Sequence, residues 1–102
     1  MVVVLFRSRL RLEAGEEYHR TAQRLLDLAQ SIPGFVSFKT FAAADDERVS
    51  IIEFESEEAV RAWYTHPEHL KAQQRGRELF YEEYKIQVCT VGRAYGFARE
   101  ET

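Results

Sequence analysis

The chain has 102 residues, 45% of them hydrophobic and 13% aromatic, which suffices for one core and predicts a single domain over residues 1–102. The 17 acidic and 14 basic residues give a formal charge of −3, which excludes the strongly basic surface typical of nucleic-acid-binding proteins. The single cysteine, Cys89, excludes an intrachain disulfide and a multi-cysteine metal site.

The first half of the chain predicts a strand, a helix and a β-hairpin. Residues 2–12, VVVLFRSRLRL, are rich in β-branched residues and predict a strand whose apolar run is too short to span a membrane. With the lone cysteine, this indicates a cytoplasmic protein with no membrane partner. From Glu16 to Ser31 apolar residues recur at spacings of three and four, which is typical of an amphipathic helix. Residues 35–41 and 48–55 predict two strands that are joined by a turn.

The second half predicts two helical segments and a last strand. Ser56 can cap a helix that contains Trp63. Thr65 to Glu68 match a capping box with a proline in the first turn, so a second helical segment is expected to begin there. Residues 84–97, YKIQVCTVGRAYGF, return to strand character, with Gly92 as a candidate bulge.

The order β-α-β-β-α-β predicts an α+β, ferredoxin-like fold, an antiparallel sheet with both helical regions on one face. Alternation along the strands nevertheless makes both faces apolar. In the first strand Val2, Val4 and Phe6 point to one face, and Val3 and Leu5 point to the other. The same holds for Val49 and Ile51 against Ile52 and Phe54, and for Phe35 and Phe41 against Val36 and Phe38. Helices can cover only one of these faces. We therefore expect a homodimer that packs sheet against sheet.

Three stretches of the chain resemble a known family. PGFVSFKTF, SIIEFESEEAVRAWYTHPEH and YKIQVC, in this element order, are similar to the antibiotic biosynthesis monooxygenase family of small dimeric α+β barrel proteins. The resemblance covers nearly the whole chain and implies the same dimeric barrel. The family includes cofactor-independent monooxygenases that act on quinone precursors, heme-degrading monooxygenases and enzymes of small carbonyl compounds.

The heme-degrading members use an asparagine on the first strand, a tryptophan and a histidine ligand about ten residues later. Trp63 matches the tryptophan, but Ser8 stands at the asparagine position and Gln73 at the ligand position. Glutamine is a poor ligand of heme iron. The resemblance therefore disfavours heme and implies an enzyme without a cofactor.

A cofactor-independent monooxygenase ionises its substrate, and the resulting carbanion reduces oxygen inside a dry pocket between helices and sheet. His66, His69 and Tyr81 are the candidate catalytic residues, as proton carriers or hydrogen-bond donors. The candidate residues for binding a small hydrophobic or aromatic ligand are Ser8, Phe38, Trp63 and Phe80.

Structural roles explain several of these residues equally well. Trp63 is suited to anchoring the core, and His66 to a helix end. His66 and His69 could form a metal pair, but no third ligand is evident. Phe80, Tyr81 and Tyr84 can simply pack against the last strand. The alternative function is a noncatalytic dimeric module of the same fold that binds a small ligand or heme.

Overall fold

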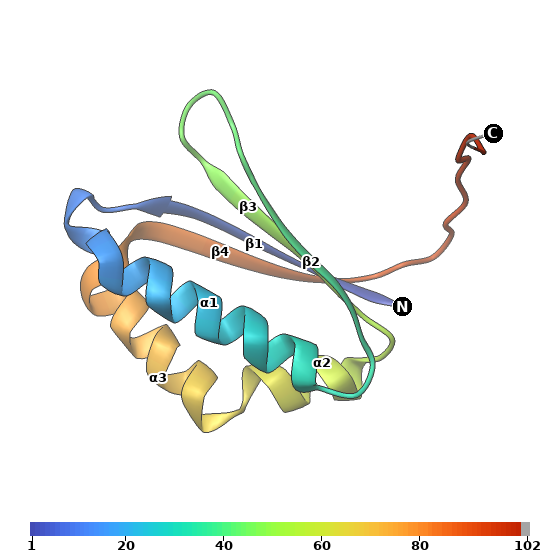
Figure 1. The fold of residues 1–102 in the computed structure, drawn as a ribbon, viewed down its shortest axis with the longest axis horizontal. Helices are drawn as coiled ribbons and strands as arrows, with labels where there is room; N and C mark the ends of the chain where they lie inside the picture. The colour runs from blue at the N-terminus through green and yellow to red at the C-terminus, as the bar shows by residue number, and fades with distance from the viewer. Residues whose placement is uncertain (101–102) are drawn as a thin grey trace.

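A four-stranded antiparallel sheet carries the helices on one of its faces, as Figure 1 shows for the computed structural model, which describes residues 1–100. The elements in chain order are β1 (Val2–Leu10), η1 (Leu12–Ala14), α1 (Gly15–Ser31), β2 (Phe35–Ala42), β3 (Arg48–Phe54), α2 (Glu57–Tyr64), α3 (Pro67–Arg75), η2 (Gly76–Phe80) and β4 (Tyr81–Thr90). The strand order is β2-β3-β1-β4, so the two central strands are β1 and β3. This is the ferredoxin-like arrangement that the sequence predicts.

The core lies between the two central strands and the helices. Alternate residues of β1 and β3, among them Val4 and Ile52, face the helices and are almost fully buried. The apolar stripes of α1 and α2 cover them with Ala29, Ala59 and Trp63. Burial of this apolar surface, at about 25 cal/mol per Å², holds the helices on the sheet.

A β-bulge in β2 corrects the predicted alternation of that strand. The pairing with β3 shifts register between Phe35 and Ser37. Because of this extra residue, Phe35 and Phe38 both pack against the core, whereas the sequence pattern places them on opposite faces. Val36 is 43% exposed at the bulge.

The start of α3 also differs from the predicted capping box. The N-cap is His66, whose Nδ1 accepts a hydrogen bond from the backbone N–H of Glu68. Thr65 ends α2 instead, and its hydroxyl donates back to the Arg61 carbonyl at 2.7 Å. Since that hydroxyl is engaged in the preceding helix, the histidine ring takes the capping role one residue later.

The first and last strands are shorter or displaced relative to the predicted ranges of 2–12 and 84–97. β1 ends at Leu10, and β4 begins at Tyr81, directly after the π-helical turn η2. β4 stops at Thr90, which pairs with Val2 at the very beginning of β1, so no neighbouring strand remains to pair with later residues. Gly92 accordingly lies outside the sheet, and residues 91–100 extend away from it with Tyr95 and Phe97 exposed (Figure 1). None of the helices within residues 1–100 combines the length and apolar character needed to cross a membrane.

Candidate functional site

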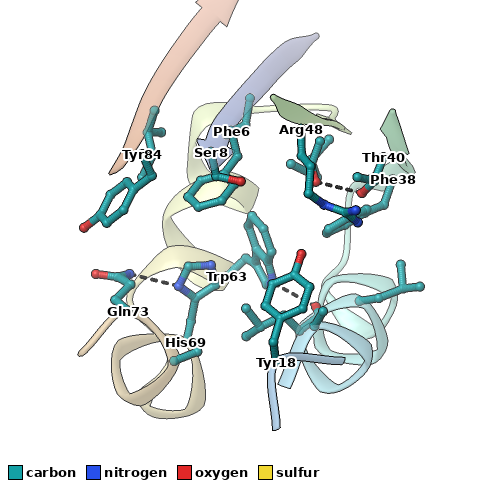
Figure 2. A pocket seen from close by; sticks show the side chains of 18 of the residues that line it. Phe6, Ser8, Tyr18, Phe38, Thr40, Arg48, Trp63, His69, Gln73 and Tyr84 are labelled. Carbon is teal, nitrogen blue, oxygen red and sulfur yellow. Dashed lines mark hydrogen bonds between the residues drawn. The ribbon is translucent and has the colours of Figure 1, made fainter. Parts of the chain in front are cut away.

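A cavity of about 470 Å³ lies between the helix-covered face of the sheet and the helices α1, α2 and α3. The sequence predicts a ligand pocket at this place. Its size falls within the range of roughly 300–1,000 Å³ that is usual for small-molecule sites. Most of its wall is apolar and aromatic, and Figure 2 shows these side chains converging from the sheet above and the helices below.

The strand register makes the sheet side of the cavity apolar at one end and polar at the other. Ser8 of β1 pairs with Arg48 of β3 and with Tyr84 of β4, so these three side chains form one row on the helix-facing side. Two residues further along, Ser50 pairs with both Phe6 and Thr40, and the next row is entirely apolar. Polar groups are therefore gathered at the end of the cavity near the start of β3.

Trp63 of α2 forms part of the wall and part of the core at once. Its indole N–H donates to the Leu25 carbonyl of α1 at 3.2 Å, which ties the two helices together. The ring lies edge-on to Phe38, with ring centroids 6.1 Å apart, and is 6% exposed. Because the N–H is engaged by the scaffold, Trp63 can offer a ligand only its aromatic surface.

His69 of α3 stands next to Trp63, with ring centroids 4.4 Å apart, and hydrogen-bonds to Gln73 one helical turn later. The amide nitrogen of Gln73 lies 2.9 Å from His69 Nδ1 and 3.3 Å from the carbonyl oxygen of Tyr64. An amide nitrogen facing a carbonyl oxygen must donate, so the same NH₂ group also donates to Nδ1. The proton of neutral His69 therefore resides on Nε2, which points away from Gln73 (Figure 2).

The protonation of His69 follows from the same surroundings. The residue is 8% exposed, and burial lowers its pKa from 6.5 to about 4, with a smaller contribution from the charge of His66. A proton on Nδ1 would in addition oppose the NH₂ group of Gln73. At neutral pH His69 is thus a neutral hydrogen-bond donor through Nε2–H and a weak base.

Three aromatic side chains from β1 and β4 close another side of the cavity. Phe6 stacks on Tyr84 with ring centroids 5.5 Å apart and meets Tyr81 edge-on at 5.4 Å. Burial is the largest cause of a raised pKa at Tyr81, so its phenol stays protonated and can act only as a hydrogen-bond donor or acceptor near neutral pH. The Tyr84 hydroxyl accepts from Arg77 at 3.1 Å.

The structure brings five of the seven predicted site residues together around the cavity. These are Ser8, Phe38, Trp63, His69 and Tyr81. The other two lie elsewhere: His66 caps α3, and Phe80 is 1% exposed at the end of η2, where its ring meets Tyr18 edge-on. Ser8 is buried in the fold and lines the cavity from β1.

Arg48 is the site residue that the sequence reasoning missed. It lines the cavity from the first position of β3, with its guanidinium carbon 5.9 Å from the centre of the Tyr18 ring. The signal was present in the sequence, because Arg48, Ser50, Ile52 and Phe54 alternate along one strand. A period of two places the arginine on the same face as the two buried residues.

His69 does not fit the role of a heme ligand. A histidine that binds iron normally donates its second ring N–H to an acceptor. His69 does the reverse, because its Nδ1 accepts from Gln73, and the nitrogen left for iron carries the proton. Within residues 1–100, no three His, Cys, Asp or Glu side chains are grouped so that they could hold a metal ion.

Comparisons with known proteins agree with the fold and with the sequence resemblance. The family model described as antibiotic biosynthesis monooxygenase matches residues 1–75. The uncharacterized protein YqjZ of Bacillus subtilis is 33% identical over 90 residues, which cover 88% of this chain and 78% of that protein.

Two solved structures are similar to this chain at low sequence identity. Rv0793 of Mycobacterium tuberculosis has a TM-score of 0.80 and 19% identity, with 93% of this chain and 98% of that chain covered. SnoaB of Streptomyces nogalater, described as a cofactor-independent oxygenase, has a TM-score of 0.74 and 20% identity, with 91% and 94% covered. At these identities the likeness shows the fold alone.

Proposed function

The chain belongs to the antibiotic biosynthesis monooxygenase family, and on that basis we propose that it is a monooxygenase that oxidises a small aromatic or enolisable compound without a bound cofactor. The observation that carries the proposal is the aromatic-walled cavity into which His69 presents a neutral ring whose proton is fixed on Nε2. The description of SnoaB as a cofactor-independent oxygenase is consistent with such chemistry on this fold.

The proposed reaction converts a CH₂ group next to an aromatic ring or carbonyl into a carbonyl. The substrate loses a proton to solvent before it enters the cavity, and its carbanion adds there to O₂ to give a peroxide anion. The peroxide takes up a proton and then loses water, so one oxygen atom remains in the product and the other leaves as water. The protein supplies a place that excludes bulk water and orients the planar substrate on Trp63 and Phe38.

Hydrogen bonds to the developing negative charge are the second contribution of the protein. One donor is His69 Nε2–H. The hydroxyl of Ser8, which lies beside Arg48 on the sheet, is a second. Donors that are already oriented stabilise an oxyanion more than water does, because they need no reorganisation during the reaction. His69 acts here by hydrogen bonding rather than as a base, since its pKa of about 4 makes it a weak proton acceptor.

Oxygen consumption with a panel of anthrone-like and quinol substrates tests this function. We expect His69→Gln to lower kcat at least about tenfold, because it removes the Nε2–H donor. Trp63→Phe should mainly raise KM through lost stacking surface. Arg61→Met, at an exposed position of α2 outside the cavity, should leave turnover unchanged.

Two outcomes of these oxygen-uptake measurements would contradict parts of the proposal. Oxygen uptake that is identical in wild type and His69→Gln contradicts the role given to His69. Absence of uptake with every substrate, combined with saturable binding of the same compounds, supports a noncatalytic ligand-binding module instead.

We further propose that two copies of the chain form the functional unit by packing their sheets face to face. The face opposite the helices carries six apolar residues, namely Val3, Leu5, Phe41, Val49, Ile51 and Cys89, and the register places Lys39, Glu53 and Gln87 among them. Figure 1 shows that no helix covers this face, and Phe41 is 48% exposed on it. A second copy presents the same apolar surface in return, as a two-fold symmetric interface requires.

A further inference from the structure

Arg48 is a cation whose own fold gives it no anionic partner. Its Nε is buried and has no hydrogen-bond partner, and within residues 1–100 no carboxylate oxygen lies within 4 Å of its guanidinium. Arg7, Arg9 and Arg75, by contrast, each pair with an acidic side chain at the surface. The guanidinium lines the cavity without an ion pair, and its terminal N–H groups, unlike Nε, are not buried, so they are available to an acceptor on a ligand.

The groups around Arg48 favour a negatively charged ligand. No Asp or Glu within residues 1–100 lines the cavity, so the guanidinium charge is not neutralised there. The hydroxyls of Thr40 and Ser50 lie in the neighbouring row and bond to each other at 2.7 Å. Figure 2 shows Arg48 reaching down from β3 toward Tyr18, on the other side of Trp63 from His69 and Gln73.

We propose that this end of the cavity binds the negative oxygen of the ligand, so that the substrate is a small planar acid taken up as its anion. The charge resides either on a carboxylate or on the oxygen of an ionised enol or phenol, and the planar guanidinium suits both. The planar body of the ligand then lies against Trp63 and Phe38, and its far edge approaches His69 Nε2–H. The inference rests on the proposed function, since it assumes that this cavity is the substrate site.

Binding of an anion at Arg48 also explains how a substrate carbanion can form although the cavity contains no strong base. Electrostatic attraction to Arg48 favours the ionised form of an enolisable substrate over its neutral form. The substrate then arrives electron-rich, and the protein need not remove the proton itself. For such substrates, affinity should rise with pH through the ionisation of the ligand.

Ligand binding can be measured through the fluorescence of Trp63, because it is the only tryptophan of the chain and lines the cavity. Quenching of Trp63 fluorescence is measured with trans-cinnamate and with trans-cinnamamide, which have nearly the same shape but differ in charge. To test whether the negative oxygen belongs to an enolate, 1,3-indanedione is added to the protein at pH values below and above its own pKa, with 1-indanone as the neutral reference. These probes require no turnover, so they report binding separately from oxygen uptake.

We expect wild type to bind at least one anionic probe roughly ten- to hundredfold more tightly than its neutral counterpart, as a hydrogen bond to a charged group implies. Arg48→Met should abolish this preference while still binding the neutral probe, and Arg48→Lys should keep part of it. Arg61→Met is the matched control, because it removes the same charge from an exposed helix position outside the cavity. Cinnamate preference assigns a carboxylate ligand, and preference only for ionised 1,3-indanedione assigns an enolate.

Equal affinity for charged and neutral probes, an unchanged preference in Arg48→Met, or no saturable quenching by any anionic probe would overturn the proposal. Circular dichroism confirms the fold of Arg48→Met, and Arg48→Gln replaces it if the methionine variant does not fold. The proposed oxygenase function fails independently if Arg48-dependent binding is found but oxygen is not consumed. Conversely, oxygen uptake without any preference for anions retains the oxygenase and removes the anion site.

Discussion

The surroundings of His69 and Arg48 determine the charge that each side chain contributes to the cavity. His69 is held neutral because it is buried and because Gln73 donates to its Nδ1. Arg48 keeps a charge that no carboxylate within residues 1–100 offsets at salt-bridge distance. The two residues therefore give the cavity a donor that carries no charge and a cation, a combination that suits an electron-rich, negatively charged planar ligand.

The state of His69 predicts a pH dependence of stability. Its pKa in the folded protein, about 4, lies below the ordinary value of 6.5, so the unfolded chain binds more protons between these values. Neutral His69 therefore makes its full contribution to the free energy of unfolding above pH 6.5, and this contribution is lost as the pH falls toward 4. The loss amounts to at most about 3 kcal/mol. Urea denaturation between pH 7 and 4.5 should show a flatter profile for His69→Gln than for wild type.

Leu70→Gln at an exposed position of α3 provides the control, since this substitution removes no group that titrates between pH 4.5 and 7 and should follow the wild-type profile. Measurements stay above pH 4.5 because Arg75 and Arg9 hold the pKa values of Glu17 and Asp45 below normal, and these carboxylates contribute at lower pH. A profile of His69→Gln parallel to that of wild type would contradict the neutral, buried state assigned to His69.

At the scale of elements, the turn between α3 and β4 fixes the aromatic wall of the cavity. Gly76 is buried at the start of η2, and a Cβ added there would lie 2.8 Å from Cε2 of Tyr81. Within a helix, alanine normally stabilises relative to glycine by about 1 kcal/mol. Here the clash reverses that sign, because the Tyr81 ring is packed against Phe6 and Tyr18 and cannot move freely.

We therefore expect Gly76→Ala to lower the free energy of unfolding by about 1–3 kcal/mol, as over-packing of a filled site usually does. It should also weaken binding of probes to the cavity, since Tyr81 lines it. Gly92→Ala is the matched control, because nothing lies within 4 Å of a Cβ at that position. Equal melting temperatures for the two variants would show that Tyr81 is less constrained than this packing indicates.

The sequence predicts most elements correctly because their patterns are long. The helix ending at Ser31, the hairpin and the order of the strands follow from hydrophobic periodicity, and the structure confirms them. The bulge at β2, the cap at His66 and the end of β4 at Thr90 could not be predicted in this way. Each depends on a single pairing or hydrogen bond with a partner that local patterns do not identify.

The candidate site was predictable to a similar degree. Trp63 and His69 stand out by residue type, and the structure places both at the cavity. The role of Gln73 depends on the four-residue spacing from His69 together with the Tyr64 carbonyl, which only the folded chain brings near. Arg48 was readable from strand alternation, but a charged residue at a strand start is usually exposed, so its inward direction needed the structure.

At the scale of the whole molecule, the uncovered face of the sheet determines the expected assembly. Leu5 lies near the middle of that face, paired with Ile51 and Gln87, and its side chain is only partly buried. A group of apolar side chains on an uncovered sheet face favours association, because two copies remove each other's apolar surface from water. We expect light scattering after size-exclusion chromatography to give the mass of two chains at micromolar concentration.

Leu5→Glu should shift this dimer to monomer and lower the melting temperature, because the interface would bury two unpaired carboxylates. Leu70→Glu is the matched control, since Leu70 is 47% exposed on α3, on the helical side of the molecule. A monomeric wild type would contradict sheet-to-sheet assembly outright. A Leu5→Glu variant that remains dimeric would place the interface elsewhere, and a dimer lost equally in Leu70→Glu would place it on the helices.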